Sequence, residues 1–255
     1  MIDKTKTVSY EDIKDYKLGA IYRKGKTTFR VFAPQRKVKL SISKDYKNPR
    51  KDIYSMKING LGVREFSLDG DYEGYYYSYI VDDEYEVTDP YSLTSSINSM
   101  YSVVIDMETT NPAGFKSSPV PSIPEDQAIM YEMNIKNYTA DESSGVVNRG
   151  KYLGLTEEGT SYKEFKTGLD NLEELGISHI QILPIYDFIS VDEDEQRFFD
   201  DDNYNWGYDP ELYFAPEGSY AINPYDPKSR VREVKKMVDA IHNKNIAVIM
   251  DVVYN

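Results

Sequence analysis

The hydrophobic pattern of this chain changes its period once, and that change constrains the fold more than any other feature. From about residue 18 to residue 107, apolar residues alternate with polar ones, as in strands with one buried face. After residue 126, apolar runs typical of buried strands alternate with runs at helical spacing. The pattern therefore predicts an all-β part followed by an α/β part.

The first part contains several short alternating runs. In "VKLSIS", Val38, Leu40 and Ile42 fall on one face, and "GYYYSYIVDD" repeats the alternation with tyrosines. Turn signals such as Asn59-Gly60 separate the runs. Short alternating strands with regular turns predict a β-sandwich of roughly a hundred residues.

The second part has the order of elements that forms a parallel sheet. Strands are expected at 127–135, 179–184 and 247–253, and helices at 161–176 and 229–245. A strand-helix-strand order repeated in this way requires parallel strands joined by right-handed crossovers.

The first of these helices is expected to begin with a capping box. Ser161 is the predicted N-cap and Glu164 its partner. Phe165, Leu169 and Leu172 then recur at helical spacing along the run.

Two irregular stretches remain. Residues 108–126 contain four prolines, which indicates a linker. The roughly 45 residues from 184 to 229 form a long loop, and in a parallel α/β barrel such a loop emerges where active sites lie. Its seven acids between 192 and 202 either attract calcium or form a solvated acidic face; the spacing of a dedicated calcium loop is absent, which favours the solvated face.

Composition excludes several classes of function. The net charge of -13 argues against non-specific nucleic-acid binding, and the absence of Cys with only two His argues against zinc. The 24 Tyr suit stacking on sugars and equally suit strands. We expect no signal peptide and no membrane span, and therefore a cytoplasmic location, which the lack of Cys also fits.

The string "YNWGYDP" at 204–210 gives the chain a specific resemblance. Together with "GKYLGLTEEGT", "ILPIYDFISVDE", "APEGSYAINP" and "VIMDVVYN", it resembles the type I pullulanases, debranching enzymes of the alpha-amylase clan. The alternating part, with "GAIYRKGKTTFRVFAPQRKVKLSI" and "VTDPYS", resembles the family-48 carbohydrate-binding module that precedes the barrel in these enzymes. The resemblance extends from about residue 17 to residue 255.

This resemblance implies a fold class and domain boundaries. It implies an immunoglobulin-like carbohydrate-binding β-sandwich followed by an incomplete (β/α)8 TIM barrel. The implied parts are an N-terminal extension (1–16), the sandwich (17–107), a Pro-rich linker (108–126) and the first three β/α units (127–255).

The resemblance also implies an activity. It implies retaining hydrolysis of α-1,6-glucosidic linkages in pullulan, amylopectin or glycogen, which needs two carboxyl groups about 5–5.5 Å apart. In the clan these groups follow later barrel strands, so we expect no catalytic residue in this chain and no activity of the chain alone. The expected partner is an α-glucan; no cofactor is expected to be required, and a structural calcium stays open.

Five residues are candidates for the site by the same resemblance. Tyr208 is expected to stack on the sugar beside the scissile bond, and Asp209 to support that subsite, although an Asp there also caps turns. For Trp206 two alternatives are open: it contacts the substrate, or it is a core residue that fixes the loop. Asp251 and Asn255 are expected to support the floor of the active site. Glu132 and Asp187 near strand ends are interpreted as structural acids.

The sequence departs from the family after its first barrel strand. Most members read close to "HVRDFS" there, whereas this chain reads "NIKNYT", so that Asn134, Lys136 and Asn137 replace His, Arg and Asp. Lys lacks the fixed fork of donors of Arg. Phe32 stands where Trp is common in the module.

Two classes of function remain open from the sequence. One is the front part of a debranching hydrolase; the other is a non-catalytic α-glucan-binding protein that uses the sandwich and the Tyr208 loop. The apolar run at 247–253 favours the first, because a bare parallel edge invites aggregation. Solubility and binding to amylopectin would discriminate between them.

Overall fold

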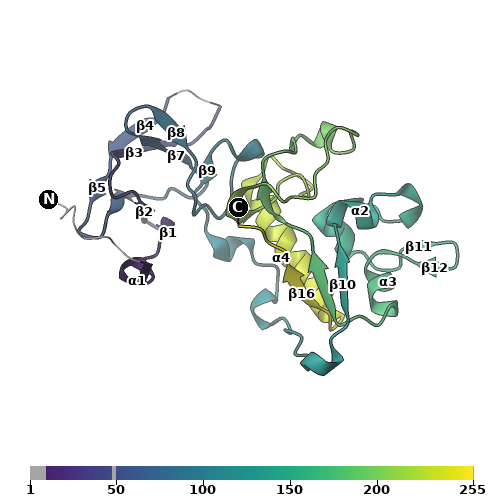
Figure 1. Ribbon diagram of the computed structural model, residues 1–255. Coiled ribbons are helices and arrows are strands. Elements are labelled where there is room, and N and C mark those ends of the chain that lie inside the picture. The colour runs from purple at the N-terminus through teal and green to yellow at the C-terminus, as the bar shows by residue number, and fades with distance from the viewer. Residues whose placement is uncertain (1–9, 48–49, 255) are drawn as a thin grey trace. The chain divides into compact units, whose positions relative to one another are not determined.

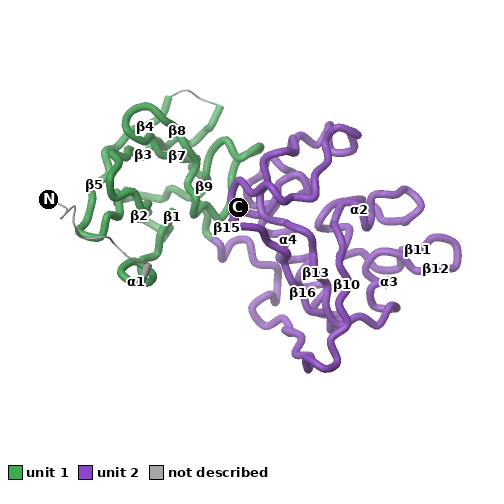
Figure 2. The backbone as a smooth tube through the Cα atoms, viewed as in Figure 1, with its two compact units in different colours: residues 1–106 green, residues 107–255 purple. Residues whose placement is uncertain are grey.

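The chain forms two compact units, residues 1–106 and 107–255 (Figures 1 and 2). The computed structural model describes residues 10–47 and 50–254. Most of the predicted N-terminal extension and the candidate residue Asn255 therefore lie outside the described residues.

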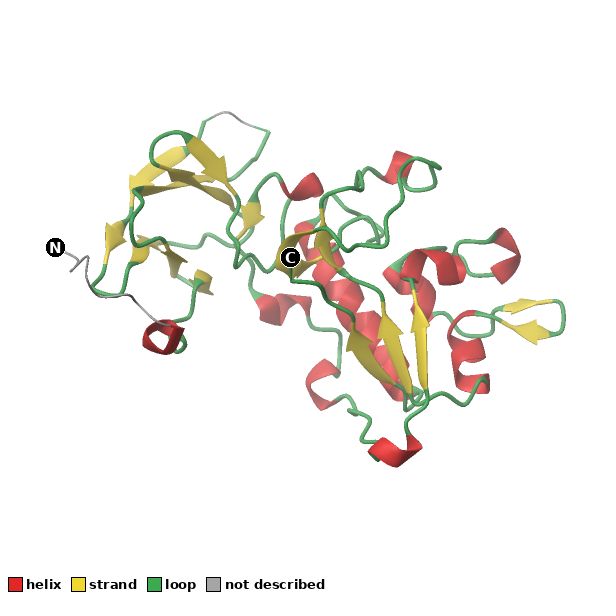
Figure 3. Cartoon of the chain, in the orientation of Figure 1, coloured by secondary structure: helices red, strands yellow, loops and turns green. Residues whose placement is uncertain are grey.

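The first unit consists mainly of two antiparallel sheets (Figure 3). One sheet has the order β1 (Gly19–Arg23), β2 (Lys26–Phe32), β6 (Val63–Asp69) and β5 (Lys57–Ile58). The other has the order β4 (Asp52–Ser55), β3 (Val38–Ser43), β7 (Tyr76–Val81) and β8 (Tyr85–Val87), with β9 (Ser102–Val103) also pairing with β7. Short helices are α1 (Tyr10–Ile13) and the 3-10 turn η1 (Ile97–Ser99).

The two sheets share one hydrophobic core, as the alternation predicts. Phe29 of β2 and Leu40 of β3 are completely buried, and the ring of Phe29 meets the ring of Tyr77 edge-on with centroids 5.0 Å apart. Tyr77 and Tyr79 are therefore core residues and do not reach a ligand at the surface. Ser41, which alternates with Leu40 and Ile42 along β3, is also buried, and β3 lies between β4 and β7.

The second unit is built on a three-stranded parallel sheet in the order β10 (Met130–Met133), β13 (His179–Ile182) and β16 (Ala247–Met250). All three strands fall inside the predicted runs, and their parallel pairing is confirmed. The principal helices are α2 (Ile135–Thr139), α3 (Gly168–Glu174) and α4 (Pro227–Asn243). Smaller elements are β11 (Ser161–Tyr162), β12 (Phe165–Lys166), β14 (Tyr186–Phe188), β15 (Pro210–Pro216), and the 3-10 turns η2 (Met107–Thr110), η3 (Phe115–Ser117), η4 (Glu125–Gln127), η5 (Glu142–Ser144), η6 (Tyr152–Thr156) and η7 (Glu195–Arg197).

One face of the parallel sheet is covered at its central strand. Ile180 and Ile182 of β13 have no exposed surface and pack with Leu172 of α3 and Ile241 of α4 in one core. On the opposite face, Met130 is 62% exposed and Ile249 is 37% exposed. The described residues form no closed barrel. None of the helices in 10–47 and 50–254 has the length and apolar character that crossing a membrane requires.

The predicted helix at 161–176 is wrong in its first half. Residues 161–166 form the β11–β12 hairpin, in which Phe165 is 63% exposed, and the helix begins at Gly168. The N-cap is Thr167, not Ser161. Two hydrogen bonds between Thr160 and Thr167 close the hairpin, and this local pairing outweighs the capping box. Phe165 was predicted at helical spacing with Leu169 and Leu172, but of these three residues only Leu169 and Leu172 are buried. The spacing of Phe165 therefore does not reflect a helix.

The second predicted helix agrees better with α4. Asp226 accepts a hydrogen bond from the backbone N–H of Lys228, and Pro227 occupies the first turn, where a missing N–H costs nothing. Part of the Pro-rich segment is attached to this helix. The ammonium of Lys235 donates to the carbonyl of Met107 and to the side chains of Thr110 and Asn111, at 3.0, 2.7 and 2.7 Å.

Candidate functional site

The candidate site lies where the parallel strands end. The loop after β13 contains the antiparallel pair β14–β15, which the sequence did not predict, and "YNWGYDP" leads into β15. Asp251 directly follows β16. Carboxyl ends of parallel strands gather at one edge of a sheet, so residues far apart in sequence meet there.

Tyr208 and Asp251, both predicted as site residues, are in direct contact. The hydroxyl of Tyr208 donates a hydrogen bond of 2.6 Å to Oδ2 of Asp251. This bond, followed by burial, raises the pKa of Tyr208 to about 12, so the hydroxyl stays a donor at neutral pH. The Tyr208 side chain is 37% exposed, which leaves part of its ring accessible to a ligand.

Asp209 and Trp206 flank this pair in different ways. Oδ2 of Asp209 accepts from the backbone N–H of Ser190, and its carbonyl accepts from the N–H of Ile189, so the residue joins the turn to the end of β14. Oδ1 of Asp209 is buried and has no hydrogen-bond partner among the described residues. Trp206 is 58% exposed, so it is not a core residue.

The turn that carries these residues depends on Gly207. Its φ of +92° lies in the left-handed region, and its N–H donates to Oδ1 of Asn205 at 2.8 Å. A Cβ at this position would lie only 3.0 Å from the ring of Phe188 and 3.1 Å from Pro184. Glycine is therefore required both by the backbone conformation and by the close approach of β14.

We expect Gly207→Ala to lower the free energy of unfolding of the second unit by more than the roughly 1–2 kcal/mol that a left-handed backbone alone costs. Gly159→Ala is the matched control, because Gly159 has φ of +73° and a Cβ added there would meet no other atom within 4 Å. Urea unfolding of both variants measures the difference. Equal losses in the two variants would contradict the role of the Phe188 and Pro184 contacts.

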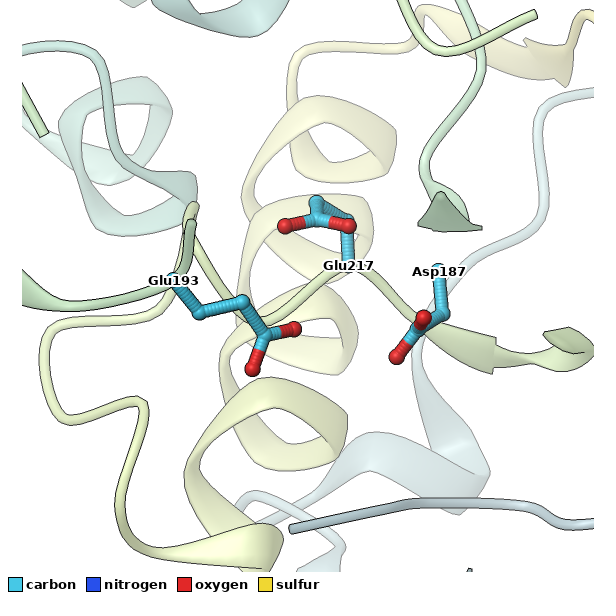
Figure 4. A group of neighbouring side chains, drawn as sticks. All are labelled: Asp187, Glu193 and Glu217. Carbon is cyan, nitrogen blue, oxygen red and sulfur yellow. The ribbon is translucent and has the colours of Figure 1, made fainter. Parts of the chain in front are cut away.

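A buried group of acids lies beside the site and was missed as a group by sequence reasoning (Figure 4). Asp187, Glu193 and Glu217 are each at most 2% exposed, and oxygens of all three lie within 4.8 Å of one another. Three carboxylates in this arrangement have the donor set that a calcium ion takes. The segment 192–202 is thus not simply a solvated acidic face, since Glu193 is buried.

Arg230 of α4 supplies a positive charge to this group. Its guanidinium nitrogens contact Asp187 at 2.9 Å and Glu193 at 2.6 Å, and all three side chains are buried. Burial opposes the charge of Arg230, but Glu193 and Asp187 outweigh burial, so the pKa of Arg230 is raised. Burial and then the neighbouring carboxylates raise the pKa of Glu217. The structural interpretation of Asp187 agrees with this ion pair.

Comparison with known proteins found extensive similarity to one group. The pullulanase of Bacillus subtilis (strain 168) is 36% identical over 98% of this chain and 34% of its own length. Isoamylase 3 from Oryza sativa subsp. japonica is 31% identical over 82% of this chain. A mutant pullulanase from Paenibacillus barengoltzii complexed with maltotriose has a TM-score of 0.89 and 35% identity, covering 94% of this chain and 38% of that one. No protein-family model matches the chain.

The second structural match agrees with the first. The pullulanase of Anoxybacillus sp. LM18-11 complexed with maltotetraose has a TM-score of 0.85 and 37% identity, covering 98% of this chain and 37% of that chain. The fold and the matched sequences thus define the class of debranching glycoside hydrolases. Within this class the chain belongs to the pullulanases, of whose length it spans about a third.

Proposed function

We propose that the chain contributes the substrate-binding side of an enzyme that hydrolyses α-1,6-glucosidic linkages in pullulan, amylopectin or glycogen. The observation that carries this proposal is the hydrogen bond between Tyr208 and Asp251, made at the carboxyl ends of the parallel strands. It holds a partly exposed aromatic ring on the turn that also carries the exposed Trp206. Such rings provide a flat apolar face for a sugar, together with a polar edge.

The donors and acceptors around Tyr208 suit a hydroxyl-rich ligand. Oδ1 of Asp209 is a buried acceptor without a partner, which costs about 1–3 kcal/mol, and a sugar hydroxyl would satisfy it only after a shift of the turn that exposes the atom. Trp206 adds an indole N–H donor. We assign Tyr208 to stacking, Asp209 and Trp206 to the walls of the subsite, and Asp251 to holding the Tyr208 ring. Asn255 keeps its assignment to the floor of the site.

We further propose that the parallel sheet is the beginning of a (β/α)8 barrel. Its uncovered face, with Met130, Glu132 and Ile249, is the face that a barrel would enclose. The two-sheet unit is proposed as an immunoglobulin-like carbohydrate-binding module, within the boundaries given above. The nucleophile and the acid/base of a retaining reaction would come from later strands, so the chain alone is expected to be inactive. A cytoplasmic location remains part of the proposal.

The test is binding of maltotetraose to the 255-residue chain, followed by the fluorescence of Trp206, the only Trp. We expect Tyr208→Ala to weaken binding about tenfold, because the stacking face is lost. Tyr208→Phe keeps the ring and loses only the bond to Asp251, so its affinity should fall less than about threefold. Thermal unfolding of each variant controls for misfolding.

Equal binding by wild type and Tyr208→Ala would remove Tyr208 from the site. The hydrolysis of pullulan, measured as new reducing ends, separates the two classes of function. One result would favour the non-catalytic glucan-binding protein: the chain binds maltotetraose, and neither the chain nor any longer form isolated from its source hydrolyses pullulan.

A further inference from the structure

Two of the residues that depart from the family sequence after β10, Lys136 and Asn137, contact the loop that presents Trp206 and Tyr208. Asn134 begins α2, where its side chain accepts a hydrogen bond of 3.1 Å from the N–H of Asn137. The next two polar side chains, Lys136 and Asn137, extend from this first turn to residues 198–204. The residues that replace the family residues therefore still make contacts from this turn.

Lys136 holds the loop through its backbone. Its ammonium donates to the carbonyl oxygen of Phe198 and, at 3.3 Å, to that of Asn203, and it lies 4.6 Å from the centre of the Phe198 ring. Burial lowers the pKa of Lys136, while the charge of Asp200 opposes this shift. A single cation thus joins two points of the loop that are five residues apart.

Asn137 holds the loop through a side chain. Its Nδ2 donates a hydrogen bond of 2.7 Å to the hydroxyl of Tyr204, the first residue of "YNWGYDP". Tyr204 stands two residues before Trp206 and four before Tyr208. The contact is made at the surface, since both side chains are exposed.

Further hydrogen bonds connect the attached segment to the rest of the loop. The buried amide of Asn203 donates to the carbonyls of Asp192 and Arg197 at 2.8 and 3.0 Å, and its oxygen accepts from the N–H of Asp192. Lys151 also packs on the Phe198 ring, with its ammonium 3.5 Å from the ring centre. These contacts fix residues 198–204 immediately before the turn that carries Trp206 and Tyr208.

We propose that Lys136 and Asn137 are positioning residues that fix residues 198–204 and thereby orient Trp206 and Tyr208 toward an α-glucan. The identity of the ligand in this inference rests on the proposed function, whereas the positioning of the loop does not. Neither residue contacts the glucan; both act through the loop. The Arg of the family string and the Lys of this chain are both cations that can donate to backbone carbonyls, as Lys136 does here.

The first readout requires no ligand. Acrylamide quenching of Trp206 fluorescence is expected to increase at least about twofold in Lys136→Met, because a loosened loop exposes the indole further. Lys136→Arg should restore the wild-type value, since Arg also donates to carbonyls. Lys236→Met, at an exposed position of α4, is the matched control and should quench like the wild type.

The second readout is the dissociation constant for maltotetraose, which should rise about tenfold in Lys136→Met and remain unchanged in Lys236→Met. Should Lys136→Met not fold, Asn137→Ala gives the same test, because it removes an exposed hydrogen bond. Unchanged quenching in folded Lys136→Met or in Asn137→Ala would overturn the positioning role. If the wild-type chain does not bind maltotetraose, the proposed function fails, whereas the quenching series still decides the positioning.

Discussion

Replacing Arg230 with Met is expected to destabilise the second unit by at least about 3–5 kcal/mol, because it leaves buried carboxylates without their cation. Asp187, Glu193 and Glu217 stay buried in the variant, and their mutual repulsion is no longer offset. A domain is stable by only about 5–15 kcal/mol in total. Urea unfolding followed by circular dichroism should therefore show a large loss of stability or no folded second unit.

The pH dependence of this variant tests the cause. Lowering the pH protonates Glu217 first, because burial and its neighbouring carboxylates raise its pKa, and this reduces the repulsion, so the deficit of Arg230→Met should shrink as the pH falls. Arg232→Met, two residues away on α4, is the control and should change stability by less than about 1 kcal/mol. A loss in Arg230→Met that is the same at pH 4 and pH 7 would indicate lost packing and not uncompensated charge.

The close approach of the guanidinium also explains a glycine in "APEGSY". A Cβ on Gly218 would clash with the Arg230 guanidinium and with Oε1 of Glu193. The N–H of Gly218 donates to that same oxygen at 3.0 Å. The glycine is therefore required by the ion pair and not by its backbone conformation.

Asp89→Ala is expected to destabilise the first unit by about 3–5 kcal/mol. Oδ2 of Asp89 accepts from the hydroxyls of Tyr77 and Tyr79 at 2.8 and 3.1 Å, and Oδ1 accepts from the N–H of Tyr91 at 2.9 Å. Removing the carboxylate leaves two buried hydroxyls without an acceptor, each costing about 1–3 kcal/mol. Urea unfolding followed by tyrosine fluorescence measures the loss.

Asp89 also makes the stability of the first unit depend on pH. Burial raises its pKa from 3.8 to about 6, although the three hydrogen bonds oppose the shift. The folded state therefore binds the proton more tightly than the unfolded state. Stability is then highest below about pH 4, falls as the pH rises to about 6, and is constant above; a shift of this size corresponds to about 3 kcal/mol.

The control for this prediction is Asp89→Asn, which retains the shape and an acceptor but cannot ionise. Its free energy of unfolding, measured from pH 4 to pH 7, should lack the decrease seen in the wild type. The difference between the two curves isolates Asp89 from all other titrating groups. Parallel curves would show that the proton on Asp89 does not affect folding.

Local periodicity predicted several elements because it reports burial directly. The helix at 229–245 agrees with α4 to within two residues at each end, since its apolar residues share one face. The cap at Asp226 and the proline at 227, which the prediction did not use, place its start two residues earlier. The prediction at 161–176 was wrong because a capping box and a spacing of three or four residues also occur by chance. There the pairing of Thr160 with Thr167 decided the conformation.

The site was predicted in part. Tyr208 and Asp251 were both identified by resemblance, but their contact spans 43 residues and follows from the path of the chain. The ion pair of Arg230 was missed because a single Arg in an amphipathic helix pattern is usually solvent-exposed. Its partners Asp187 and Glu193 are 43 and 37 residues away.

By itself the sequence determined the alternation of the first unit, the parallel strands of the second and the family to which the chain belongs. Those properties depend on neighbours along the chain or on strings of residues. The tertiary structure alone decided that Arg230 neutralises buried acids, that Lys136 holds the loop and that Tyr208 bonds to Asp251. Such contacts join segments whose separation in sequence carries no information on their distance, because it is the packing of strands and helices that brings them together.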